Sequence, residues 1–406
     1  MIGFSPTEDQ KLMADSVGQF ARTVLRPKIR EHEKARELPD AVRRMAHELG
    51  LGLVALPEAI GGAGLGMTTA VILEEEVAWG DPAAAFAFGG PGAFGFAMRE
   101  LATEAQAREA LAPFVAEDGF ARFGAVAWGE KKAHATRPGL STTAKKDGDA
   151  WVLDGKKSYV VNADRAASFV VFAQVTEADG WKGIGAFLVA RDASGLTVKA
   201  RDTSLGLDIA SFGGLELAGV KAAARLEGNG SFDQALVRFF ARHALLVAAR
   251  GVGLSRAAFD VTREYVDTRK AFGKPIGHFQ AVAFNVADRA IDVDAARGLV
   301  WRAAAAWDAF DGGAGKERDA LHASAQAIAF AHEAAMRCGD DGVQLHGGAG
   351  FMRDYPVEKF MRDAKQLGLC GMTAEHADQL AAALELGVPL DPGLVLPTAE
   401  TQSAFI

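Results

Sequence analysis

A short connection between two helical stretches carries a cation, aromatic rings and an amide within twelve residues. It reads RKAFGKPIGHFQ and runs from Arg269 to Gln280. A guanidinium can bind phosphate through parallel charge-assisted hydrogen bonds, and an aromatic ring beside an amide suits a flat heteroaromatic ring. The segment therefore favours a nucleotide-like ligand, although its composition alone also fits an exposed turn with solvated charges.

A second candidate segment is rich in glycine. It reads QLHGGAGF over residues 344–351 and is followed by YPVEK at 355–359 and by Arg362-Asp363. Glycines let a backbone approach a ligand closely and present its N–H groups to that ligand. A plain loop between two helices fits the same pattern. No GxGxxG follows a strand, so a Rossmann nicotinamide site has no support.

The elements that position these segments are expected to be helices on either side of a β-region. Apolar spacing predicts helices over residues 9–30, from Pro39 onward and over 67–79. Short alternating runs between residues 120 and 232 predict strands, with a hairpin at Asp154-Gly155. We expect four units, listed here in order: a helical domain at 1–119, a β-domain at 120–232, a helical bundle at 233–385 and an extended tail at 386–406.

Composition excludes several classes of function. The chain has 406 residues and a net charge of -8, which argues against a general nucleic-acid binder. Its two cysteines, Cys338 and Cys370, form no CxxC motif, so we expect neither a disulfide framework nor a metal site. Residues 1–20 resemble neither a signal peptide nor a membrane anchor. We expect a cytoplasmic protein without a membrane partner.

Taken together, these motifs resemble the acyl-CoA dehydrogenase family over essentially the whole chain. The motifs are RKAFGKPIGHFQ, QLHGGAGF and YPVEKFMRDAK, with Pro57-Glu58 before a glycine-rich loop and Glu74-Glu75-Glu76 in a helix. The resemblance implies a mostly α fold with a central β-domain. Its three parts would be an N-terminal helical domain, a β-barrel-like middle domain and a C-terminal four-helix bundle.

The resemblance also implies an FAD-dependent oxidoreductase of fatty acid metabolism. It would dehydrogenate an acyl-CoA thioester between the α and β carbons and pass electrons to an electron-transfer flavoprotein. Each FAD site would be completed by a neighbouring subunit of a homotetramer, or of a heterotetramer with a homologous subunit. The residues that would bind FAD are Arg269, Phe272, Phe279, Gln280, Gln344, Leu345, Gly347, Gly348, Thr373, Glu375, Tyr159 and Glu130.

The catalytic carboxylate of most family members is missing from its usual place. Gly371 stands at the base position of the run LCGMT, and Met372 replaces the usual glycine. Some branches place the base at the start of the helix before the RKAFG-like motif. That position is His243, whose ordinary pKa near 6.5 suits a base at neutral pH. Ala244 stands at the usual arginine position, and Arg242 is an alternative cation, although neighbouring helical residues point about 100° apart.

The flavin-edge motifs of the β-domain depart as well. In the segment GEKKAHA at 129–135, only Glu130 matches the family. Tyr159 replaces a tryptophan and can still stack on a ring. Val161 replaces a threonine and cannot donate a hydroxyl hydrogen bond. Lys131, Lys132 and His134 fit either contacts to a CoA phosphate or a solvated loop.

Two hypotheses follow from this pattern. The first is a dehydrogenase-type enzyme whose base is relocated to His243 or supplied by the substrate. The second is a non-catalytic partner subunit that completes the FAD site of a homologous chain, because the nucleotide-end motifs are kept and the ring-end motifs are altered.

Overall fold

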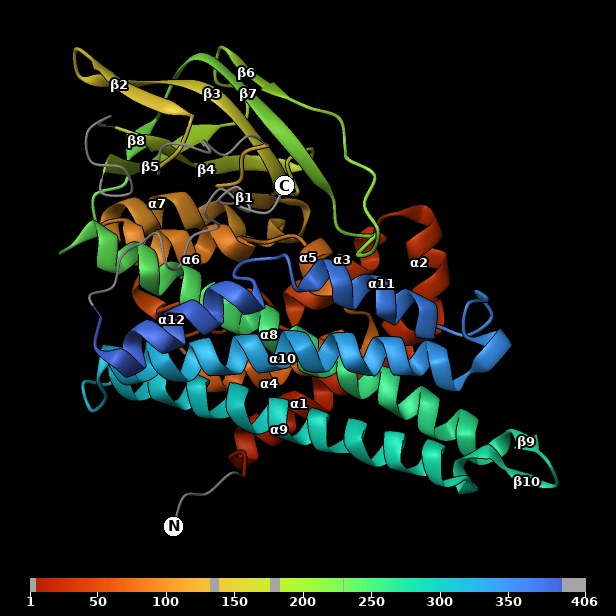
Figure 1. The fold of residues 1–406 in the computed structure, drawn as a ribbon. Coiled ribbons are helices and arrows are strands. Elements are labelled where there is room, and N and C mark those ends of the chain that lie inside the picture. Colours follow the sequence, from red (N-terminus) through yellow and green to blue (C-terminus); the bar gives the residue numbers. More distant parts are fainter. Residues whose placement is uncertain (1–4, 132–138, 176–182, 229, 389–406) are drawn as a thin grey trace, which may run out of the picture.

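The computed structural model describes residues 5–131, 139–175, 183–228 and 230–388, and its elements run in the expected order of helices, sheet and helices (Figure 1). Among the described residues, none of the helices combines the length and apolar character needed to cross a bilayer. The elements before the sheet are α1 (Glu8–Phe20), η1 (Ala21–Leu25), η2 (Arg26–Lys28), α2 (Ile29–Ala35), α3 (Asp40–Glu48), η3 (Glu58–Ile60), α4 (Gly66–Gly80), α5 (Ala84–Ala87), α6 (Gly92–Leu101), α7 (Glu104–Val115) and η4 (Gly119–Ala121).

The first predicted helix is interrupted in its second half. α1 begins with a capping box, in which Thr7 accepts from the Gln10 N–H and the Gln10 side chain accepts from the Thr7 N–H. A π-helical turn and a 3-10 turn then separate α1 from α2. The 3-10 turn contains Pro27, which has no N–H for a continuous α-helical ladder.

The middle segment forms an open sheet and no closed barrel among the described residues. The sheet has eight strands in the order β6-β7-β3-β2-β4-β5-β8, with β1 paired in parallel to β4. It lies over α6 and α7 at one side of the molecule (Figure 1). The strands are β1 (Phe123–Ala127), β2 (Thr143–Asp147), β3 (Ala150–Val161), β4 (Ala166–Gln174), β5 (Ile184–Ala190), β6 (Leu196–Val198), β7 (Phe212–Lys221) and β8 (Ala224–Arg225).

The hairpin predicted at Asp154-Gly155 is wrong, because both residues lie inside the continuous strand β3. The turn comes earlier, at Gly148, between β2 and β3. Gly155 has a φ of 148°, and a Cβ there would lie 2.6 Å from the Thr142 Cα. The pairing of β3 with β7 also shifts register between Leu153 and Gly155. Here glycine marks a bulge and a close backbone approach, not a chain reversal.

The C-terminal segment is built on three long helices, which lie side by side in Figure 1. A small hairpin, β9-β10, protrudes at one end of them. Most of the expected extended tail lies outside the described residues. The elements are α8 (Phe232–Thr268), β9 (Lys270–Ala271), β10 (Lys274–Pro275), η6 (Ile276–His278), α9 (Gln280–Asp311), α10 (Glu317–Leu345), η7 (Gly347–Ala349), α11 (Val357–Leu367) and α12 (Ala374–Leu386).

Three successive glutamates of α4 join the N-terminal helices to the bundle. Glu74 pairs with Arg250 of α8 at 2.8 Å. Glu75 is buried and receives Arg256 of α8 and Arg297 of α9, each at 2.8 Å. Glu76 also binds Arg256. Breaking one partner of a buried ion pair leaves an uncompensated charge, so these pairs constrain how α4, α8 and α9 dock.

Asp308 of α9 provides the cap for a helix that is distant in sequence. Its carboxylate accepts from the backbone N–H groups of Met67 at 2.5 Å and Thr68 at 2.9 Å, in the first turn of α4. These N–H groups have no partner within their own helix, and a carboxylate also complements the positive end of the helix dipole.

We therefore expect Asp308→Ala to lower the free energy of unfolding by about 1–2 kcal/mol, as measured by urea denaturation. Asp294→Ala is the matched control. Asp294 lies on the same helix, but its side chain is 80% exposed in its pair with Arg297, so its loss should change stability by less than about 0.5 kcal/mol. Equal effects of the two substitutions would contradict the capping role.

Candidate functional site

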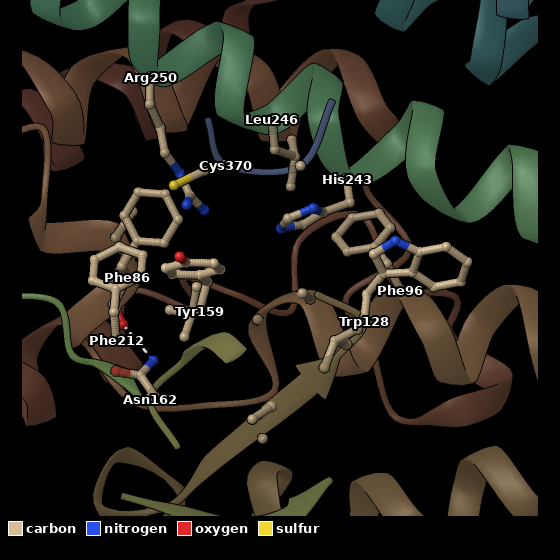
Figure 2. Close-up of a pocket in the computed structure, with 18 of the residues that line it drawn as sticks. Phe86, Phe96, Trp128, Tyr159, Asn162, Phe212, His243, Leu246, Arg250 and Cys370 are labelled. Carbon is tan, nitrogen blue, oxygen red and sulfur yellow. Dashed lines mark hydrogen bonds between the residues drawn. The ribbon is translucent and has the colours of Figure 1, made fainter. Parts of the chain in front are cut away.

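A large cavity lies where α8 faces the end of β3 and the loop before α12. Its volume is about 1060 Å³, and its wall combines aromatic, aliphatic and a few polar side chains. Figure 2 shows His243, Leu246 and Arg250 pointing from α8 toward it. These three residues follow i, i+3, i+7 spacing and so share one helix face. Other lining residues are Glu74, Phe86, Phe96, Trp128, Glu130, Tyr159, Val161, Asn162, Phe212, Phe239, Phe240, Cys370, Gly371 and Thr373.

The two positions considered for a catalytic base meet inside this cavity. A Cβ placed on Gly371 would lie 3.4 Å from the His243 Nδ1 and 3.3 Å from the Ala244 Cα. Gly371 has a φ of 81°, in the left-handed region that favours glycine. A side chain at position 371 would thus require a strained backbone, and its Cβ would be in van der Waals contact with His243.

His243 is an uncharged imidazole in the wall of the large cavity. Burial, with a smaller contribution from the positive charge of Arg250, lowers its pKa to about 3. Its ring stacks on Phe239 with centroids 6.2 Å apart. Neighbouring Cys370 is no substitute base, because burial raises the pKa of its thiol to about 12. At neutral pH, the nitrogen lone pair of His243 is therefore the basic group next to Gly371.

The cation in the cavity is Arg250, not Arg242. Arg242 is buried on another side of α8, where it pairs with Asp311 at 2.6 Å and with Glu100 at 3.0 Å, over the Trp307 ring. The idea that Arg242 replaces the missing arginine is therefore wrong. Arg250 is 6% exposed, pairs with Glu74 and lies 4.3 Å from the centre of the Phe86 ring.

The end of β3 forms the opposite wall of the cavity. Tyr159 is 63% exposed, although it lies in a strand, and both Tyr159 and Asn162 have left-handed φ angles of 58° and 59°. A register shift between Lys157 and Val160 accompanies this geometry. The Asn162 amide donates to the Phe86 carbonyl at 2.8 Å, as the dashed line in Figure 2 shows. Its Oδ1 is buried and has no partner among the described residues.

Glu130 lines the cavity but is engaged within the protein. Its carboxylate accepts from the Lys157 ammonium at 2.7 Å, from the Thr142 hydroxyl at 2.7 Å and from the Ser141 and Thr142 N–H groups. Lys157 is fully buried, and this burial lowers its pKa to about 8 against the opposing pull of Glu130. These bonds pin the loop that carries Trp128. Lys132 and His134 of the same loop lie outside the described residues.

A second cavity of about 560 Å³ brings together several residues from the two motifs. Arg269 and Thr268, at the end of α8, face Leu345, Gly347 and Gly348 across it. A Cβ on either glycine would meet nothing within 4 Å, so this side of the turn is open. The other lining residues are Tyr265, Ile276, His346, Ala349 and Tyr355.

His346 is a further polar side chain that lines this second cavity and that the motif alone did not single out. Its ring stacks on Tyr265 with centroids 4.1 Å apart, and its Nδ1 lies 2.7 Å from the Gly342 carbonyl. Since that carbonyl can only accept, Nδ1 carries the proton and Nε2 is left as an acceptor. Nε2 is buried and has no partner among the described residues.

The remaining predicted cofactor residues do not line either cavity. Phe272 is 97% exposed at the tip of the β9-β10 hairpin, and Phe279 packs edge-on against it. Gln280 and Gln344 are exposed at the start of α9 and near the end of α10. Glu375 is exposed in the first turn of α12, whose N-cap, Thr373, does line the large cavity. The FAD contacts of these residues stay predictions.

The donor set of the two cavities fits the two ends of FAD. Arg269 and the open Gly347-Gly348 turn suit a pyrophosphate, and the free acceptor of His346 suits a hydroxyl or amino group of the nucleotide. In the large cavity, Tyr159 offers a ring face and Asn162 offers an unused amide oxygen. Val161 brings no hydroxyl to this wall, and Gly371 brings no carboxylate, so the ring end offers fewer polar groups than the family pattern leads one to expect.

Comparison with known proteins identifies the class. Acyl-CoA dehydrogenase family models match residues 7–118 (N-terminal domain), 125–220 (middle domain) and 232–383 (C-terminal domain). The chain therefore belongs to the acyl-CoA dehydrogenase family, whose members use FAD.

Individual members of the family are similar to this chain over nearly its full length. A probable acyl-CoA dehydrogenase of Mycobacterium bovis is 32% identical, covering 89% of this chain and 91% of the relative. The structure of butyryl-CoA dehydrogenase from Megasphaera elsdenii is 26% identical with a TM-score of 0.85, covering 95% of this chain and all of the other. The structure of a glutaryl-coenzyme A dehydrogenase in complex with glutaryl-CoA is also 26% identical, with a TM-score of 0.85, covering 99% and 100%.

The pKa of His243 makes stability depend on pH. Its folded value, about 3, lies below the unfolded value of 6.5, so the unfolded chain takes up the proton first as pH falls. The stabilising contribution is therefore complete above pH 6.5 and is lost as pH falls toward the folded pKa. His332, buried on α10 with a pKa lowered to about 4 by burial, acts in the same direction.

We expect His243→Gln to remove about 2 kcal/mol of the stability loss between pH 6.5 and 4.5, because glutamine does not titrate. Urea denaturation of both proteins at several pH values measures this change in slope. His278→Gln, which replaces an exposed histidine of the connecting hairpin, serves as the control. An unchanged slope in His243→Gln would show that the imidazole is already charged in the folded protein.

Proposed function

We propose that this protein is an FAD-dependent acyl-CoA dehydrogenase in which His243 stands in for the missing carboxylate. One observation carries the proposal: His243 and Gly371, the two possible base positions, are in contact on one wall of the large cavity, and Tyr159 lies on the wall opposite. An acyl thioester between these walls would present its α carbon to the imidazole. FAD, when bound against Tyr159, supplies the hydride acceptor for the β carbon.

The residues of this chain divide the remaining tasks. Uncharged His243 accepts the α proton through its free lone pair. This transfer creates an imidazolium near Arg250, which is unfavourable in the empty cavity. The negative charge that develops on the thioester oxygen at the same moment offsets that repulsion. The aromatic wall of Phe86, Trp128 and Phe240 excludes water and strengthens these interactions.

Assembly is part of the proposal. His243 and Arg269 both belong to the α8 region but are 26 positions apart, which at ~1.5 Å per residue separates them by about 39 Å. An extended dinucleotide is shorter than this distance. The cavity that suits the pyrophosphate would therefore serve the FAD of another subunit, as in a tetramer. Transfer of electrons to an electron-transfer flavoprotein in the cytoplasm completes the proposed role.

A second candidate function is that of a non-catalytic partner subunit in a heterotetramer. It is favoured by a difference between the two cavities in how many of the family's motif residues each one keeps. The nucleotide-end cavity keeps Arg269 and the Gly347-Gly348 turn, whereas the ring-end cavity has no carboxylate at position 371 and no hydroxyl at Val161. Such a chain would complete the FAD site of a homologous subunit.

Purification of the chain alone separates the two functions. The enzyme proposal predicts a yellow protein with about one FAD per chain, measured from its flavin spectrum. Arg269→Ala should weaken FAD binding at least about tenfold, because charge-assisted bonds to the pyrophosphate are lost. Arg263→Ala, which removes an exposed arginine of the same helix that lines neither cavity, is the matched control.

A colourless protein that turns yellow only on co-expression with a homologous chain would establish the partner-subunit function instead. Unchanged FAD affinity in Arg269→Ala would contradict the role given to the second cavity under either function.

The role of His243 has its own test. His243→Ala should lower the rate of flavin bleaching by acyl-CoA at least about 100-fold, because positioned general bases contribute roughly that much. The flavin content and melting temperature of the variant show whether the fold and cofactor are retained. If bleaching by a reactive acyl-CoA proceeds at the unaltered rate, His243 is not the base.

A further inference from the structure

Arg250 uses only part of its guanidinium within the protein. Its Nε donates to Glu74 at 2.8 Å and its Nη2 donates to the same carboxylate at 3.2 Å. Nη1 makes no hydrogen bond to any residue that the structure describes, yet the side chain is 6% exposed and lines the large cavity. An arginine held in place by a glutamate therefore presents an uncommitted donor to a largely apolar chamber (Figure 2).

Among the described residues, the neighbouring side chains that line the cavity around this donor carry no negative charge apart from Glu74. Leu246 and Phe86 are apolar, the Cys370 thiol is protonated and Gly371 has no side chain. His243, two turns away on the same helix face, is uncharged. Nη1 is uncommitted and accessible from the cavity, so a ligand that fills the cavity without supplying an acceptor would desolvate this donor at a cost in free energy. Whatever fills the cavity gains affinity by bringing an oxygen to Nη1.

We propose that the acyl group of the substrate carries a second carboxylate, and that Arg250 is the residue that selects it. This inference rests on the proposed acyl-CoA function and deepens it. The substrate would be a monothioester of a dicarboxylic acid, with its α carbon at His243 and its free carboxylate bound by Nη1 about two turns further along α8. Arg250 would then bridge the carboxylate of Glu74 and that of the ligand, as the planar donor fork of arginine allows.

An unsubstituted acyl chain would fit this chamber less well. Its methylene groups would meet the guanidinium and leave Nη1 dry and unpaired. The second carboxylate of a dicarboxylic monothioester carries a negative charge. That charge would offset the positive charge that His243 acquires when it takes up a proton.

The experiment compares matched thioesters on the FAD-containing protein in its native assembly. Malonyl-, succinyl-, glutaryl- and adipyl-CoA are each paired with the unsubstituted acyl-CoA of the same carbon number, and Kd is measured by isothermal titration calorimetry. At one or more lengths, the dicarboxylic ester should bind at least about tenfold more tightly than its partner. In Glu74→Gln/Arg250→Met, which removes both members of the ion pair together, this ratio should fall to about one.

Two further variants keep the test decisive. Arg250→Lys keeps the positive charge beside Glu74 but loses the planar set of guanidinium donors, so the ratio of the two Kd values should fall several-fold. This single variant keeps the test informative if the double variant does not fold. Arg256→Lys is the matched control, because Arg256 lies on the same helix, pairs with Glu75 and Glu76 and does not line the cavity. It should keep the ratio of the unaltered protein.

The outcomes distinguish this inference from the function on which it rests. Binding of acyl-CoA esters without preference for a second carboxylate overturns the role of Arg250 and leaves the dehydrogenase function standing. A preference that survives Arg250→Lys undiminished also overturns it. If no thioester of either kind binds to the FAD-loaded protein, the acyl-CoA function fails and the inference fails with it.

Discussion

The rotation of α8 about its own axis is the constraint on which both cavities depend. This helix has 37 residues, and one of its faces supplies His243, Leu246 and Arg250 to the large cavity. A turn of about 100° would replace His243 by a neighbour in sequence. Ion pairs prevent this rotation from two directions: Arg250 and Arg256 bind α4, and Arg242 binds Asp311 and Glu100 on another side. The buried ion pairs of α8 thus fix the orientation of the helix and, with it, the position of the uncharged His243 side chain.

The charge balance of the cavity differs in kind from that of a site with a carboxylate base. A carboxylate beside Arg250 would be stabilised as an anion and would hold the α proton weakly. An imidazole that accepts a proton begins neutral and ends positive, close to a guanidinium. In the proposed mechanism, proton transfer to His243 would therefore be coupled to negative charge on the ligand, through the thioester oxygen or a second carboxylate. Under that proposal, substrate charge would be a condition for reaction and not only for binding.

Several parts of this structure were predictable from the sequence, because they depend on local patterns. Helical periodicity located α4 and the long helices. The two motifs predicted that Arg269, Gln280 and the Gln344–Gly348 turn serve one ligand across subunits. Within this chain Arg269, Gly347 and Gly348 line one cavity and the two glutamines do not, and the ligand stays a prediction. The spacing of His243 to Arg250 also contained the signal that Arg250, and not Arg242, shares its helix face. Arg242, adjacent to His243 in sequence, points about 100° away from it.

Other features depend on tertiary contacts that no local pattern encodes. Asp154-Gly155 carries a strong turn signal, but Thr142, which immediately precedes the neighbouring strand β2, occupies the space that a Cβ on Gly155 would need, so the glycine allows a bulge. The free acceptor of His346 exists only because the Gly342 carbonyl, one helical turn away, takes up the other ring nitrogen. The sheet is open because its end strands, β6 and β8, do not pair with each other. The sequence of such short strands does not show which partners they take.

The departures at positions 243, 250 and 371 are best understood as one coupled set. Gly371 adopts a left-handed φ of 81°, so a glutamate there would meet backbone strain of roughly 1 kcal/mol, with its Cβ in contact with the His243 ring. Burial, helped by Arg250, keeps that ring neutral, and Glu74 keeps Arg250 in place. Restoring the usual carboxylate alone would place it against a histidine and near a guanidinium. The backbone at position 371 thus favours glycine, which agrees with the proposal that the acid–base chemistry of this cavity comes from α8 or from the ligand.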